Sequence, residues 1–63
     1  MCELTVYMIK GKEREKVMDG VVRLTPRDGQ VLLEGIFGES KTVEGRLADV
    51  DITAQVANVV AVS

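Results

Sequence analysis

Apolar and polar residues alternate along the chain in short runs, which is the pattern of half-buried β-strands. The first run spans residues 3–10 and begins almost at the chain start. Its apolar face carries Leu4, Val6 and Met8. Its other face carries Thr5, Tyr7 and Ile9, and is too apolar to be fully exposed. This run predicts a strand that fixes the start of the chain in space.

Turn residues divide the rest of the chain into further short strands. The clearest turn is Pro26–Gly29, because proline fixes φ and Gly29 accepts positive φ after Asp28. It predicts an antiparallel hairpin between residues 21–25 and 30–36. Further turns are predicted at the polar tip 10–16, at Asp19-Gly20, at 37–40 and at 53–55.

Side-chain faces and glycines refine these strands. Val22 and Leu24 are expected to point the same way, and Val43 and Leu47 are expected to face the core. Two glycines interrupt strand patterns. We expect Gly35 to mark a bulge or close approach and Gly45 to let its strand bend sharply.

These elements predict an all-β protein of five to six short antiparallel strands, folded as a small barrel or a highly curved sheet. One domain should span residues 1–63. With a single tyrosine and a single phenylalanine, the core must consist of aliphatic residues and methionine. No segment predicts a helix, because Asp19-Gly20 and β-branched residues oppose the one helical period, at 14–22.

The small size predicts an oligomer. A chain of 63 residues buries a marginal core, and its single cysteine cannot form an internal disulfide. A homo-oligomer is therefore expected. The lone cysteine favours a reducing compartment, and neither a signal peptide nor a membrane span is visible, so we expect a cytoplasmic protein. A net charge of −2 argues against a nucleic-acid partner.

The chain start carries the best candidate chemistry. Cys2 is the only cysteine, and the chain contains no histidine. The Met1 amine, the Cys2 amide nitrogen and the Cys2 thiolate could chelate a metal through fused five-membered rings. Such mixed donors suit Ni(II) or Cu(II), and a thiolate also suits Zn(II) or Cu(I). Binding must displace protons, and a dimer could join two such sites.

Plainer interpretations stand beside these candidates. Cys2 alone has no ligand spacing and could be a tolerated surface thiol. Asp49 and Asp51 share a strand face and could bind a hard cation, but are more typical of a solvent-facing pair. Ser40 has no histidine to activate it, which argues against nucleophilic hydrolysis. Metal-assisted or carboxylate-only catalysis is conceivable, but 63 residues leave little room for a pocket, so we expect no enzyme. Met8 and Met18 fit core positions better than soft-metal sites.

Three sequence segments resemble one family. These are Met1-Cys2-Glu3 leading into a strand, IFGESKTVEGR at 36–46, and Val50-Asp51-Ile52. Together with the length, they resemble the CooT family of small nickel-binding accessory proteins of carbon monoxide dehydrogenase, once labelled predicted RNA-binding proteins.

The resemblance implies an SH3-like or Sm-like β-barrel, a homodimer and Ni(II) bound through Cys2, with the Met1 amine as a companion ligand. It implies structural roles for Phe37, Gly38, Gly45 and Arg46, and carbon monoxide dehydrogenase or a related nickel enzyme as the client. The alternatives are a small RNA-binding or protein-interaction β-barrel module. The acidic charge and the absence of a basic stripe weigh against RNA.

Overall fold

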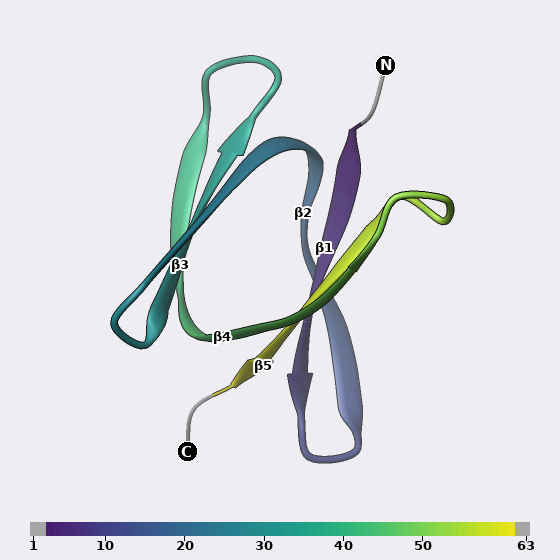
Figure 1. Cartoon of the computed structure of the whole chain (residues 1–63), viewed down its shortest axis with the longest axis vertical. Coiled ribbons are helices and arrows are strands. Elements are labelled where there is room, and N and C mark those ends of the chain that lie inside the picture. The colour runs from purple at the N-terminus through teal and green to yellow at the C-terminus, as the bar shows by residue number, and fades with distance from the viewer. Residues whose placement is uncertain (1–2, 62–63) are drawn as a thin grey trace.

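A computed structural model describes residues 3–61, which form five strands and no helix. The strands are β1 (Leu4–Lys10), β2 (Glu13–Arg27), β3 (Gln30–Gly35), β4 (Ser40–Asp51) and β5 (Val56–Ala61). They pair in chain order, and β5 pairs with β1 to close a barrel (Figure 1). The predicted all-β class is confirmed. This part of the chain holds no helix of the length and hydropathy that crossing a membrane requires.

The closing pair of the barrel is parallel. β1 and β5 run side by side from Thr5↔Val56 to Ile9↔Val60. In a series of five strands that each reverse direction, the first and the fifth point the same way, so ring closure between them must be parallel. The prediction that all strands pair antiparallel is therefore wrong at this one seam.

Two long strands bend and exchange partners. β2 pairs with β1 as far as Val21 and with β3 from there on. β4 pairs with β3 through Glu44 and with β5 from Gly45 onward. Each long strand thus belongs to both halves of the barrel. The sequence predicted a turn at the bend of β2, whereas at Gly45 it predicted a bend within one strand.

The bend in β2 falls on Asp19-Gly20, where the sequence predicted a turn. Gly20 has φ +61°, a conformation that glycine adopts without strain. The strand nevertheless continues, since Val17 and Met18 before it and Val21 after it all pack on the core. Similarly, the predicted polar tip at 10–16 narrows to Gly11 and Lys12, and Glu13 already begins β2.

A register shift in β2 changes which side chains face inward. The pairing of β2 with β3 is irregular between Val21 and Arg23. Val21 is fully buried, whereas Val22 is 48% exposed and Leu24 packs against the core. The prediction that Val22 and Leu24 share a face is wrong, because the irregularity interrupts the two-residue alternation.

The core consists of aliphatic residues and one methionine, as the composition predicted. The fully or almost fully buried members are Val6, Met8, Val21, Val31, Leu33, Val43, Ala57 and Val59. They come from all five strands, so each strand contributes to one shared interior. Leu47 packs against this cluster, which confirms the predicted inward face of β4.

Candidate functional site

Met1 and Cys2, the predicted metal ligands, lie outside the described residues. The chain that follows them is firmly placed. Leu4 lies opposite Val21 of β2, and the Thr5 amide donates a 3.0 Å hydrogen bond to the Gln55 carbonyl oxygen. The backbone is therefore held from both sides two to three residues after Cys2.

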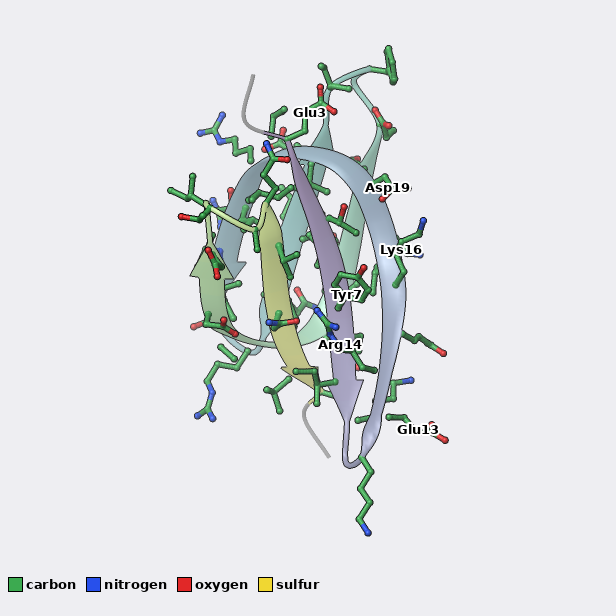
Figure 2. All side chains as sticks on the ribbon, turned by 90° about the vertical axis from the view of Figure 1, so that its right-hand side faces the viewer. Glu3, Tyr7, Glu13, Arg14, Lys16 and Asp19 are labelled. Carbon is green, nitrogen blue, oxygen red and sulfur yellow. The ribbon has the colours of Figure 1, made fainter. Side chains whose placement is uncertain are left out.

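An open hollow of about 550 Å³ lies beside the start of β1. Three elements form it: the outer face of β1, the bend of β2 and the turn between β4 and β5. Its lining consists of Glu3, Thr5, Tyr7, Asp19, Gly20, Ala54, Gln55 and Val56. Figure 2 shows Glu3 at the start of β1, with Asp19 on the neighbouring strand. The hollow faces solvent, so a hydrated ion or a partner side chain can enter it.

Asp19 is held at the edge of this hollow by two donors. Lys16 Nζ donates to Asp19 Oδ2 over 2.9 Å, and Thr5 Oγ1 donates to Oδ1 over 3.2 Å. The hydrogen bond from Lys16 lowers the pKa of Asp19, and the same bond raises the pKa of Lys16. Both side chains are more than half exposed, so water screens this ion pair. The pair orients a carboxylate but contributes little to folding.

Tyr7 also lines the hollow. The Arg14 guanidinium carbon lies 3.9 Å from the centre of the Tyr7 ring, which is a cation–π contact (Figure 2). The contact joins β1 to β2 across the outer surface of the barrel.

The other acidic candidates, Asp49 and Asp51, accept hydrogen bonds from neighbouring groups. Asp49 Oδ1 accepts a 3.1 Å hydrogen bond from Asn58 Nδ2 of β5. Asp51 Oδ1 accepts one of 3.1 Å from the Ala54 amide, inside the β4–β5 turn. Both aspartates are exposed, as the plainer interpretation predicted. Within residues 3–61, no three histidine, cysteine, aspartate or glutamate side chains gather as a metal site.

The methionines and glycines singled out in the sequence serve the fold. Met8 is 8% exposed in the core, and Met18 packs against it, as predicted. At Gly35 an added Cβ would collide with the Glu39 carboxylate, and at Gly45 it would lie 2.6 Å from the Val60 carbonyl oxygen. Both glycines therefore mark close approaches, as predicted for Gly35. Gly45 is also where β4 changes partner, which fits the predicted bend.

Sequence reasoning missed the environment of Phe37. Its side chain is 88% exposed on the β3–β4 turn, although the pattern suggested a structural role. Sequence reasoning also missed the hollow, because its lining depends on the bend of β2 and on the parallel seam. Asp19-Gly20 signals the bend as a turn, and no local pattern signals the parallel seam.

The fold and this site define a small SH3-like barrel with an open hollow beside the start of its first strand. The family model of the CO dehydrogenase accessory protein CooT matches residues 1–59, and the chain therefore belongs to the CooT family. The resemblance drawn from the sequence is confirmed.

A solved structure supports the fold independently. The crystal structure of a protein assigned as CooT from Carboxydothermus hydrogenoformans superposes with a TM-score of 0.87 at 22% sequence identity. The superposition covers 98% of this chain and 100% of that one. At this identity the likeness establishes the fold. A comparison with curated proteins found no match.

Proposed function

We propose that this protein is a nickel-binding accessory protein that holds Ni(II) through Cys2 and delivers it to carbon monoxide dehydrogenase or a related nickel enzyme. The observation that carries the proposal is the family match, which begins at residue 1 and includes the only cysteine of the chain. The role is one of binding and transfer, without catalysis.

The donor set at the chain start suits this metal. The Met1 amine, the Cys2 amide nitrogen and the Cys2 thiolate supply nitrogen and sulfur ligands in adjacent chelate rings, which Ni(II) accepts in a tetragonal geometry. If Met1 is removed, the Cys2 amine and thiolate still form one such ring. A homodimer would complete the coordination by bringing two chain starts together.

The barrel residues next to the chain start support this role. Thr5 is hydrogen-bonded to Gln55, so the strand that follows the ligands has a fixed direction. Glu3 lines the adjacent hollow and places a carboxylate near the chain start, whereas the Asp19 carboxylate beside it is paired with Lys16. Such charge attracts a divalent cation before it is bound.

A titration with Ni(II) tests the proposal. We expect a thiolate-to-metal charge-transfer band that saturates in the wild-type protein and is absent in Cys2→Ser. A matched control restores a thiol elsewhere, as Cys2→Ser combined with Lys12→Cys, at the exposed β1–β2 turn. This control should not recover tight binding. Equal nickel binding by all three proteins, or none by the wild type, would refute the proposal.

A further inference from the structure

Gln55, the last residue of the β4–β5 turn, has a backbone conformation that favours glycine. Its φ is +59°, in the left-handed region, where a Cβ atom crowds the following carbonyl oxygen. Glycine adopts this region freely and asparagine with little strain, whereas glutamine is strained there. The backbone of this turn would therefore accept glycine at position 55 at least as well as glutamine.

The hydrogen bonds of this turn use only the backbone of Gln55, among residues 3–61. The Gln55 amide donates to the Ile52 carbonyl oxygen over 3.2 Å, and the Gln55 carbonyl oxygen accepts from the Thr5 amide over 3.0 Å. The remaining hydrogen bond of the turn joins the Ala54 amide to Asp51 Oδ1. Replacing Gln55 by glycine would leave all three hydrogen bonds in place. The turn itself therefore gives no reason for a glutamine side chain.

The Gln55 side chain belongs instead to the hollow beside the chain start, which Glu3 and Thr5 also line. The hydrogen bond to Thr5 places Gln55 on the β5 side of β1. The Glu3 carboxylate lies on the β2 side, with Oε1 3.9 Å from the position that a Cβ on Gly20 would occupy. Figure 2 shows Glu3 at this end of β1. A carboxamide and a carboxylate thus flank the first residues of β1 from opposite sides.

These two groups lie close to the proposed nickel ligands. Consecutive Cα atoms are about 3.8 Å apart, so Glu3 follows Cys2 at that distance. A nickel ion held by an amine leaves N–H groups on that ligand, and water in any open position supplies O–H groups. The metal polarises these groups and makes them stronger hydrogen-bond donors. Carboxylate and carboxamide oxygens are the acceptors that such donors require.

We propose that the Gln55 carboxamide and the Glu3 carboxylate accept hydrogen bonds from the N–H and O–H groups of the nickel site and hold that site against the hollow. Gln55 is then a positioning residue, because it acts through the ligands and does not bind the metal itself. This inference rests on the function proposed above. It explains why glutamine occupies a position that suits glycine, since strained residues are retained where function requires their side chains.

Nickel titration of Gln55 variants tests the inference. Gln55→Gly should bind Ni(II) about tenfold or more weakly than the wild type, the usual effect of removing a group that orients metal ligands. Without metal, its melting temperature should equal or exceed that of the wild type. Gln55→Asn tolerates the left-handed region and keeps a carboxamide, so its nickel affinity should lie between the two.

Asp28→Gly is the matched control. Asp28 is the other non-glycine residue with positive φ in the described part of the chain, at +26°. It lies in the β2–β3 turn, away from the chain start (Figure 1). Asp28→Gly should therefore bind nickel as tightly as the wild type does.

The outcomes separate this inference from the proposed function. If the wild type binds nickel through Cys2 and Gln55→Gly binds it equally tightly, only the role of Gln55 is wrong. If Gln55→Gly melts several degrees below the wild type, its side chain stabilises the turn, and the inference is also wrong. The same holds if Asp28→Gly weakens nickel binding as much as Gln55→Gly does, because the effect is then not local. If the wild type binds no nickel, the proposed function and this inference fail together.

Discussion

Gly45 sets how closely β4 and β5 approach each other. A Cβ at this position would lie 2.6 Å from the Val60 carbonyl oxygen and 2.8 Å from Val59 Cγ1. The obstacle is backbone, which cannot rotate away as a side chain can. Gly45→Ala should therefore destabilise the protein by about 1–3 kcal/mol, the usual cost of overpacking. Urea unfolding measures this change.

The control for Gly45 is Thr42→Val on the same strand. Thr42 is exposed, so this substitution should change the free energy of unfolding by less than about 0.5 kcal/mol. Equal stability of Gly45→Ala and wild type would contradict the close approach of β4 and β5.

Asp19 makes the stability of the folded protein slightly dependent on pH. Its pKa is lowered in the folded state by the hydrogen bond from Lys16, so its contribution to stability is present above the unfolded pKa, near 3.9. The contribution disappears as the pH falls through the lower, folded pKa. We expect Asp19→Asn to melt slightly below the wild type at pH 7 and together with it at about pH 2. Thermal melts between about pH 2 and pH 7 measure the difference in melting temperature between the two proteins. A difference that persists in acid would contradict its assignment to the Asp19 carboxylate.

The turn from 36 to 39 depends on one carboxylate. Glu39 accepts the hydrogen bond of the Phe37 amide, and its own carbonyl oxygen accepts that of Gly35. Glu39→Ala removes the side-chain acceptor and should cost about 0.5–1.5 kcal/mol. Hydrogen exchange followed by NMR should then show faster exchange at the Phe37 amide. Glu44→Ala, exposed on β4 after this turn, is the control and should leave that exchange rate unchanged.

Local chemistry made several elements predictable. Gly29 adopts positive φ between β2 and β3, as predicted, but Pro26 and Arg27 belong to β2, so the turn narrows to Asp28 and Gly29. The alternating run of β1 was also predicted, and Val6 and Met8 are buried. The bend at Gly20 was misread as a turn, because glycine after aspartate favours both and only the core contacts of Val21 decide between them. The parallel seam follows from the number of strands in the ring, which no local pattern contains.

The candidate site was predictable only in part. Cys2 was singled out because it is the only cysteine, and the family match covers it. Asp49 and Asp51 were correctly expected to face solvent. Phe37 and the hollow were not found, since the exposure of a turn residue depends on what lies beside the turn after folding. The exposure of the two aspartates was therefore readable from residue type and surface shape was not, while the ligand role of Cys2 stays a prediction.

The size of the whole molecule leads to the last prediction. The barrel has a small aliphatic core in a chain of 63 residues, and such chains often depend on assembly for stability. If the protein folds as the homodimer we propose, unfolding separates two chains, and the melting temperature must rise with protein concentration. From average unfolding enthalpies, a hundredfold increase in concentration should raise it by about 10 °C. Circular dichroism melts with a chelator present, which removes bridging metal, measure this rise in the apo protein. Sedimentation at the same concentrations supplies the mass.

A constant melting temperature together with a mass of 6.9 kDa would show instead that the barrel is stable as a monomer. In that case two chain starts would have to meet through the metal itself, and adding nickel should double the mass in the wild type but not in Cys2→Ser.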